Sequence, residues 1–340
     1  MSYAIAFYLS LLLMPPVTEG QDLQRYEFDS PQMGTLFRIV FYARNDSLAE
    51  AASEAAFNRV QALNAIMSDY EHESELNALS RTSGSGAWEP VSPPLFFVLN
   101  RSMDISCHTD GAFDITVRPF VQLWRDATRK ANPVLPHPDT LAKAAKSVGF
   151  RHMDLDAQRG AVRLNRRGMQ LDLGGIAKGY AADQILDELQ QFGITSALAD
   201  AGGDILAGDP PPGQKGWNVV VPARDAGGAT AYRELTLSNA AITSSGDLYQ
   251  SVTIGGKKYS HIIDPGTGLG LTENITVTVI APDAVTADGY ASALSVMGPE
   301  KAARLVEGFA EMEVFIEFER SGSFEQLEST GFGEFIQARE

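Results

Sequence analysis

The order of helix-like and strand-like segments most restricts the folds open to this chain. Strand patterns follow one another in the second half, at 196–203, 217–223, 233–245, 258–265 and 274–282. Parallel strands need long crossover connections, whereas successive strands joined by short turns pair antiparallel. The order therefore predicts an α+β fold of mixed, mainly antiparallel sheets with packed helices, and not the regular alternation of a doubly wound nucleotide fold.

Helical patterns surround these strands. Residues 26–43 first predict a strand hairpin with a Met–Gly turn. An apolar face then repeats at helical spacing over 47–70, with Asp46 or Ser47 as the cap. Further helices are predicted after the prolines of 91–111, over 138–150 with Gly149 as the stop, over 179–193 ending at Gly193, and over 288–309.

Composition excludes one class of partner. The 340 residues are 44% hydrophobic, which is enough for a substantial core in one large domain or two intimate ones. The formal net charge is -16, and no long run of Lys and Arg interrupts it. An acidic chain without a basic stripe binds nucleic acid phosphates poorly, so we expect no nucleic acid partner. A phosphorylated ligand stays possible if a metal ion supplies the positive charge locally.

The single cysteine, Cys107, limits redox and metal chemistry. One thiol cannot form a disulfide within the chain, and it excludes a four-cysteine zinc site. Cys107 precedes His108, which suggests a Cys–His nucleophile, but neighbours in sequence do not generally meet as a catalytic pair. A packed, unreactive thiol is the favoured interpretation.

The chain begins with an apolar run from Ala4 to Met14, which is too short to span a membrane comfortably. The small residues Thr18 and Gly20 follow, so residues 1–20 match a secretory signal peptide and 21–340 would form a single domain. A strand or helix of the mature fold is the alternative. No cysteine follows the run, so we expect an exported protein without a lipid anchor, in the periplasm or at the outer face of the inner membrane.

The stretch MQLDLGGIAKGYAAD, residues 169–183, is typical of a strand that turns into a helix. Its acid Asp172, its pair Gly174–Gly175 and its cation Lys178 cluster at the turn. Glycines allow close approach of the backbone to a ligand, and a helix start carries partial positive charge. The pattern matches neither the P-loop nor the dinucleotide spacing. Anion binding and an ordinary tight turn with a surface lysine both remain open.

The stretch TADGYASALSVMG places Asp288 and Ser292 four residues apart, on one face of a predicted helix. A carboxylate and a hydroxyl suit a hard cation such as Mg²⁺, which would take its other ligands from water and phosphates. The alternative is a helix-start acid and a small packing residue. Weaker signals are His261 on an apolar strand before an Asp–Pro–Gly turn, DGAFDIT entering a strand, and Asp204 after two glycines.

Together these stretches resemble the ApbE family of FAD:protein FMN transferases. The resemblance covers roughly 30 to 310 and rests on ordered motifs. These are MGT (33–35), MSDYEHESELNALS (67–80), DGAFDITVRPFVQLW (110–124), DLGGIAKGYAAD (172–183), AGGDILAG (201–208), SSGD (244–247), SHIIDPGTG (260–268) and ADGYASALSVMG (287–298). The resemblance implies that FAD is cleaved with Mg²⁺, that FMN is attached through a phosphoester to a Thr or Ser of a partner flavoprotein, and that AMP leaves.

The resemblance also assigns roles by motif. The residues implied to contact FAD are Met33, Tyr70, Ala112, Phe113, Asp114, Asp172, Lys178 and Ile262, with Ile263 nearby. Mg²⁺ would take the carbonyl of Gly175 and the side chains of Asp288 and Ser292. Relatives commonly carry Thr where Ser292 stands, but serine keeps the hydroxyl ligand.

His261 is the first candidate for the base that accepts the proton of the attacking hydroxyl, because imidazole titrates near neutral pH. Asp264 or Asp247 could take this role instead. Two other functions use the same site: an Mg²⁺-dependent FAD pyrophosphatase giving FMN and AMP, and a non-catalytic exported FAD-binding protein. The acceptor implied by the family is a flavoprotein, such as a subunit of a membrane redox complex.

Overall fold

The fold is built around one antiparallel sheet, as seen in a computed structural model that describes residues 23–130, 132–224, 229–246 and 251–336. The predicted signal peptide and Asp247 lie outside these residues. The sheet runs in the order β1-β2-β6-β7-β10-β13-β14-β15, and each neighbouring pair is antiparallel. Its strands are β1 Gln24–Gln32, β2 Thr35–Ala43, β6 Ala197–Ala201, β7 Asp204–Ala207, β10 Ala240–Gly246, β13 Ile275–Ala281, β14 Glu313–Arg320 and β15 Ser323–Glu328.

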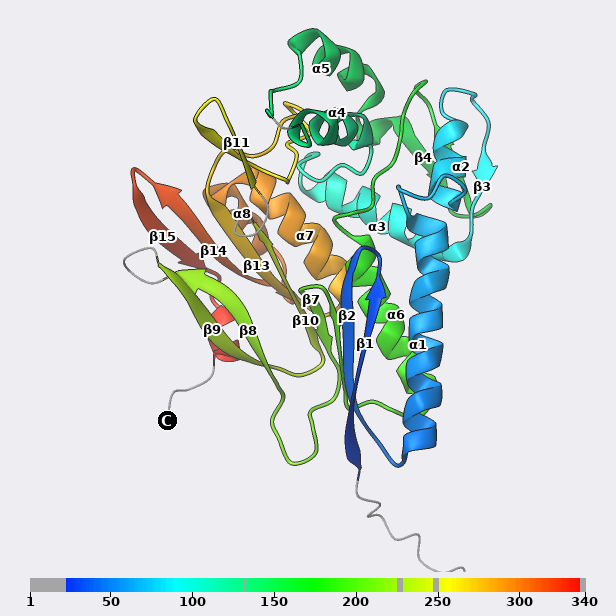
Figure 1. The fold of residues 1–340 in the computed structure, drawn as a ribbon, viewed down its shortest axis with the longest axis vertical. Coiled ribbons are helices and arrows are strands. Elements are labelled where there is room, and N and C mark those ends of the chain that lie inside the picture. The colour runs from blue at the N-terminus through cyan, green and yellow to red at the C-terminus, as the bar shows by residue number, and fades with distance from the viewer. Residues whose placement is uncertain (1–22, 131, 225–228, 247–250, 337–340) are drawn as a thin grey trace, which may run out of the picture.

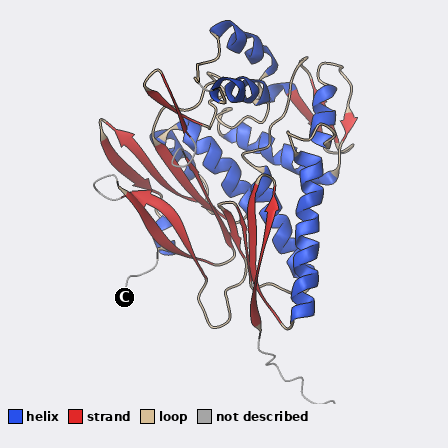
Figure 2. Cartoon of the chain, viewed as in Figure 1, coloured by secondary structure: helices blue, strands red, loops and turns tan. Residues whose placement is uncertain are grey.

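Helices cover one face of this sheet, and a separate strand pair covers part of the other (Figures 1 and 2). The helices are α1 Asp46–Met67, α2 Glu75–Arg81, α3 Pro93–His108, α4 Arg118–Thr128, α5 Pro138–Ala144, α6 Ala177–Gln191, α7 Ala284–Met297 and α8 Pro299–Val306. The smaller sheets are β3 Glu89–Pro90 with β5 Ala161–Leu164 and β4 Met153–Asp156, β8 Trp217–Arg224 with β9 Thr230–Leu237, and β11 Ser251–Ile254 with β12 Lys257–Ser260. The α+β prediction is therefore confirmed.

Helix α7 packs on the sheet beside α6 and is buried along most of its length. It packs on β10 and β13 on one side and on α6 and α3 on the other. Small residues allow this close packing: a Cβ on Gly179 of α6 would lie 2.1 Å from the carbonyl oxygen of Ala284 at the start of α7. Helix α6, which follows the Gly174–Gly175 turn, and helix α7, which carries Asp288 and Ser292, therefore cross in contact.

Several predicted elements form with shifted ends. The hairpin over 26–43 is β1–β2, and its turn is Met33–Gly34. The cap of α1 is Asn45, whose side chain accepts from the Leu48 amide at 2.9 Å, so the expected cap at Asp46 or Ser47 was wrong. Helix α3 includes the prolines in its first turn, as proline lacks only an amide that is unbonded there.

The later helices show the same shifts. Helix α5 ends at Ala144, before the predicted stop at Gly149. The helix expected from Asp288 begins at Ala284, capped by Asp283, and breaks at Gly298–Pro299.

Two predicted strands are absent. The segments after Asp110 and before Gly174 meet in a single parallel bridge, Val117 to Gln170. The Asp114 carboxylate accepts from the Thr116 amide and the Phe150 amide, each at 2.8 Å, and so folds its segment into a turn. His261 likewise lies just past the end of β12 and not on a strand.

We expect Gly179→Ala to destabilise the protein, although alanine is the better helix former by about 1 kcal/mol. The added methyl would overlap Ala284 and would lie 2.9 Å from the Cβ of Asp288, which forces α6 and α7 apart. The free energy of unfolding in urea should fall by about 1–3 kcal/mol. Gly333→Ala is the control, since its Cβ would meet no described atom within 4 Å. Equal stability of both variants would contradict the close crossing.

Candidate functional site

A cavity of about 290 Å³ lies where the predicted motifs meet. We call it the central cavity. The wall includes the segment before α4, one face of α4, the turn before α6, the segment after β12 and the C-terminal half of α7. The predicted site residues that line it are Ala112, Phe113, Asp114, Asp172, Gly175, His261, Ile262 and Ser292, together with Ile263. Met33, Tyr70, Lys178, Asp264 and Asp288 do not line it.

Gly175 and Ser292 are in direct contact across the α6–α7 crossing. A Cβ on Gly175 would lie 2.8 Å from Ser292 Oγ and 3.5 Å from the ring of Phe113. Among the described residues no hydrogen-bond partner reaches the Ser292 hydroxyl, whereas Ser295 donates to the Ala291 carbonyl at 2.8 Å. The Ser292 oxygen is therefore available at the cavity wall, next to the backbone of Gly175.

Asp288 of α7 links the two helices, although it does not line the cavity itself. Its Oδ2 accepts from the Gly179 amide at 3.1 Å, which satisfies a donor in the first turn of α6. The residue is 4% exposed. Burial, followed by the nearby charge of Asp204, raises the pKa of Asp288 to about 7. A bound cation would oppose both effects and would hold the carboxylate ionised.

Lys178 forms an ion pair with Asp204 at the start of β7, and its Nζ lies 4.0 Å from Asp288 Oδ2. Burial alone would lower the pKa of Lys178, but the charges of Asp288 and Asp204 outweigh it and raise the pKa. The lysine thus compensates two buried acids. The resemblance implied that Lys178 contacts FAD; the structure gives it this second, internal contact.

Arg125 joins Tyr70 to the central cavity. Its guanidinium lies 4.6 Å from the centre of the Tyr70 ring, 2.7 Å from Asp69 Oδ2 and 3.5 Å from Asp172 Oδ2. Tyr70 is 69% exposed, and Arg125 itself lines the cavity. Asp172 also accepts from the Gly174 amide at 2.8 Å, which fixes the glycine turn. Burial, then the charge of Asp69, raises the pKa of Asp172.

Asp114 has a structural function in addition to its place in the wall. Its Oδ1 accepts from the amide and hydroxyl of Thr116, and its Oδ2 from the Phe150 amide. Burial raises its pKa against these hydrogen bonds. Both oxygens are therefore occupied, and Asp114 ties its own turn at Thr116 to the segment that begins at Phe150.

The two candidate bases differ in their surroundings. His261 is exposed and lines the central cavity. Asp264 faces away from it: its carboxylate accepts from the Gly266 amide at 2.8 Å and the Thr267 hydroxyl at 3.0 Å, as expected in an Asp–Pro–Gly turn. The geometry favours His261 over Asp264.

Met33 lies in the β1–β2 turn with a positive φ of 45° and packs against the main core. The next residue after the turn, Thr35, contacts Gly202, where a Cβ would lie 2.5 Å from its hydroxyl. Gly202 precedes Asp204 by two residues. Met33 therefore lies near the start of β7, where Asp204 pairs with Lys178, and does not line the central cavity.

Two site residues had little signal in the sequence. Asp204 was noted only as an acid after two glycines, and its pairing with Lys178 depends on β7 lying beside α6. Arg125 was not singled out, although it follows directly on the motif that ends at Trp124. A helical reading of 118–128 would have placed Arg125 on the face of Val121, which also lines the cavity.

The donors at the crossing fit a hard cation. They are the Asp288 carboxylate, the Ser292 hydroxyl and the Gly175 backbone, and all are oxygen ligands of the kind that Mg²⁺ prefers. Within the described part of the chain, no group of three or more His, Cys, Asp or Glu side chains could hold a metal by itself. The remaining ligands would therefore come from water and the substrate.

Comparisons with known proteins identify the family of this chain. A model of the ApbE family matches residues 33–316. An FAD:protein FMN transferase of Treponema pallidum is 32% identical over 301 residues, which cover 84% of this chain and 82% of the relative. One from Klebsiella pneumoniae is 30% identical over 281 residues, 82% of this chain and 80% of the relative. The structure of the flavin transferase ApbE from Vibrio cholerae matches with a TM-score of 0.83 at 26% identity and covers 92% of this chain and 100% of that one.

The raised pKa of Asp288 predicts a pH-dependent stability in the absence of metal. The pKa of this carboxyl is about 7 in the folded protein and near 4 in the unfolded chain. Between these values the folded state holds a proton that the unfolded state has lost, so its contribution to stability is complete below pH 4 and is lost as the pH rises to about 7. With a chelator present, the free energy of unfolding should therefore fall between pH 5 and pH 8, and it should fall less in Asp288→Asn. Asp126→Asn, at an exposed acid, is the control. Parallel profiles for Asp288→Asn and the wild type would exclude the raised pKa.

Proposed function

Since this chain belongs to the ApbE family, we propose that it transfers FMN from FAD to a Thr or Ser hydroxyl of an acceptor protein and releases AMP. The observation that carries the proposal is the contact between Gly175 and Ser292 at the wall of a cavity that also holds His261. This contact brings oxygen ligands for a cation and a candidate base to one place.

We propose Mg²⁺ as the metal, held by Asp288, Ser292 and the Gly175 carbonyl. When bound, Mg²⁺ offsets the negative charge that develops on the pyrophosphate of FAD. Asp288 supplies the negative charge of the site, and its hydrogen bond to the Gly179 amide keeps the carboxylate against α6. The first turn of α6 adds partial positive charge beside the glycine turn, where a phosphate would approach.

His261 is placed to accept a proton. In the proposed reaction the acceptor oxygen bonds to the FMN-side phosphorus, the bond from that phosphorus to the bridging oxygen breaks, and AMP leaves with that oxygen. The hydroxyl proton passes to His261, because an imidazole ring can act as a general base near neutral pH. Arg125 lines the same cavity, where it is paired with Asp172 and Asp69, and its guanidinium lies over the exposed Tyr70 ring outside the lining.

Hydrolysis is the second candidate function. The central cavity is open to solvent at His261, which is exposed, so water could replace the acceptor hydroxyl and give free FMN. A protein that only binds FAD is less well supported, because binding alone does not require a cation site between Gly175 and Asp288.

We further propose that the protein acts after export, on a flavoprotein such as a subunit of a membrane redox complex. The support is the apolar run from Ala4 to Met14 and the family membership. No helix in the described part of the chain is long and apolar enough to cross a membrane. Fractionation of cells expressing the full chain would test the location.

Incubation of a candidate acceptor with FAD and Mg²⁺ should give a flavin-fluorescent protein band and free AMP. Asp288→Ala should lose both products, because it removes the charged ligand. His261→Ala should retain FAD binding and lose most of the transfer, with a fall of at least about 100-fold. Free FMN without a labelled band would indicate the hydrolase, and bound FAD without AMP would indicate the binding protein. Near-full transfer by His261→Ala would remove this residue as the base.

The Ser292 hydroxyl predicts a graded response to metal concentration. Ser292→Ala should raise the Mg²⁺ concentration needed for half-maximal AMP release by about tenfold, equivalent to about 1.4 kcal/mol. Ser292→Thr retains the hydroxyl and should stay close to the wild type. Ser295→Ala lies one turn away, where its hydroxyl bonds the helix backbone, and serves as the matched control. The same Mg²⁺ dependence in Ser292→Ala and Ser295→Ala would mean that Ser292 is not a ligand.

A further inference from the structure

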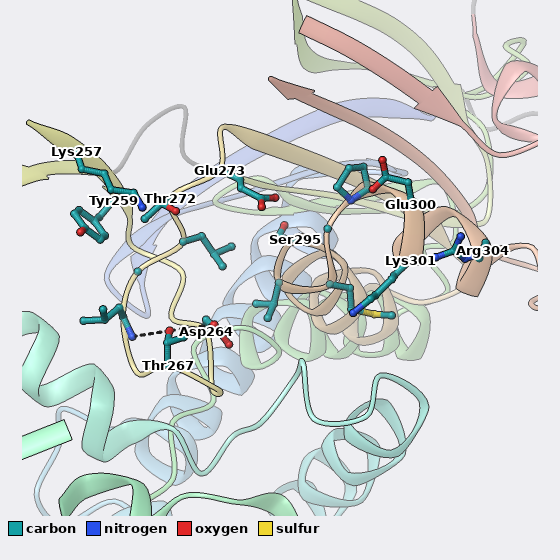
Figure 3. A pocket seen from close by; sticks show the side chains of 17 residues that line it. Lys257, Tyr259, Asp264, Thr267, Thr272, Glu273, Ser295, Glu300, Lys301 and Arg304 are labelled. Atoms are coloured by element: carbon teal, nitrogen blue, oxygen red, sulfur yellow. Dashed lines mark hydrogen bonds between the residues drawn. The ribbon is translucent and has the colours of Figure 1, made fainter. Parts of the chain in front are cut away.

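A second and larger cavity adjoins the central cavity. It has a volume of about 570 Å³ and lies between β12, the segment 264–273 and the start of α8. We call it the α8 cavity. Figure 3 shows Lys257 and Thr272 on one side of it and Glu300 and Lys301 of α8 on the other. No residue proposed to contact FAD or Mg²⁺ lines it.

The two cavities share a wall. Val296 of α7 lines both of them. The segment 261–265 turns His261 and Ile262 to the central cavity and Asp264 to the α8 cavity. A molecule seated in the α8 cavity therefore lies next to the candidate base.

The backbone on this wall has unused hydrogen-bonding groups. Segment 269–271 pairs with 260–264: the Leu271 amide donates to the Ile262 carbonyl and the Asp264 amide to the Leu269 carbonyl, both at 2.9 Å. The backbone groups of Gly270 and Thr272 point the other way, because alternate residues of a paired strand face opposite sides. Both residues line the α8 cavity, and among the described residues neither has a backbone hydrogen-bond partner; Thr272 is exposed, whereas Gly270 is buried. Such an edge can bind an extended peptide.

The charges of the α8 cavity favour an acidic occupant. Glu300 is paired with Arg320, and the Asp264 carboxylate is occupied within its own turn. Lys301 and Arg304 are exposed and form no ion pair within the described residues. Lys257 lies 5.8 Å from the Tyr259 ring and is likewise exposed, which leaves Asp264 and Glu273 as the acids of the lining without an ion pair among those residues. Three cations against these two acids leave a small excess of positive charge, in contrast to a chain of net charge -16.

We propose that the α8 cavity binds an extended, acidic segment of the acceptor protein and thereby presents its Thr or Ser to the central cavity. The inference rests on the proposed transfer to a protein hydroxyl. The acceptor backbone pairs with the exposed edge at Thr272, and its acidic side chains meet Lys301 and Arg304. Transfer to a protein hydroxyl is then favoured over hydrolysis, because only the acceptor protein makes these contacts.

Fluorescent peptides test this docking without any need for turnover. The probes are short extended peptides with one central Thr, flanked by Asp in one series and by Lys in the other. The intact protein should bind the acidic series at least about tenfold more tightly by anisotropy. The variant K301E/R304E should lose or reverse this preference. The control R44E/K215E carries the same charge change at exposed residues on the β2–α1 and β7–β8 connections and should keep the preference.

A second arm tests the strand edge. N-methylation of alternate amides in the acidic peptide should weaken binding in one of the two registers, because only every second amide faces the pairing edge. Equal effects in both registers, equal binding of acidic and basic peptides, no peptide binding, or an unchanged preference in K301E/R304E would each overturn the proposal. Displacement of the peptide by AMP alone would assign the cavity to the leaving nucleotide and would also overturn it.

These outcomes are independent of the proposed function. The peptide assay contains neither FAD nor Mg²⁺, so it can fail while AMP release from FAD persists. Conversely, a protein that releases no AMP from FAD with any acceptor loses the transferase proposal, whatever the peptides show. FAD affinity and the thermal midpoint of K301E/R304E report whether that variant is folded.

Discussion

The close crossing of α6 and α7 is the contact on which the site depends. Gly179 leaves no room for a side chain against Ala284, and its amide donates to Asp288 across the crossing. The same approach brings Gly175 against Ser292. Two proposed ligands, Asp288 and Ser292, thus come from α7 and the third, Gly175, from the turn directly before α6, and this helix pair is held against the central sheet. The geometry of the ligands is therefore set by core packing, and a mobile loop is not needed to assemble them.

This crossing also buries charge, which has to be compensated. Asp288 and Asp204 lie in the interior with Lys178 as their shared cation, so the group carries one net negative charge when all three are ionised. Removing charges from water is costly unless they are paired. A bound cation would complete the compensation. Without a cation, the raised pKa of Asp288 favours uptake of a proton by this carboxylate. Metal binding and protonation are then alternatives at the same carboxylate.

The sequence predicted what is local and missed what is not. The Met33–Gly34 turn, the buried strand β13 and the helix around Asp288 were predictable because turn chemistry and apolar patterns act over a few residues. The prediction of a strand before Gly174 was wrong, because a run of buried apolar residues does not distinguish a paired strand from a loop covered by other elements. The Lys178–Asp204 pair joins residues 26 positions apart, so only the sheet order could reveal it.

The segment after β12 connects this chemistry with recognition. It separates the two cavities, and it is held by a small core of its own, formed by Phe120, Trp124, Tyr259 and Ile263. Gly270 lies so close to this core that a Cβ would be 2.2 Å from the Ser260 carbonyl oxygen and 2.8 Å from the Trp124 ring. This packing places His261 on one side of the segment and the open edge on the other. An acceptor bound at that edge would meet the base at a set distance, which is the positioning that converts binding into selective transfer.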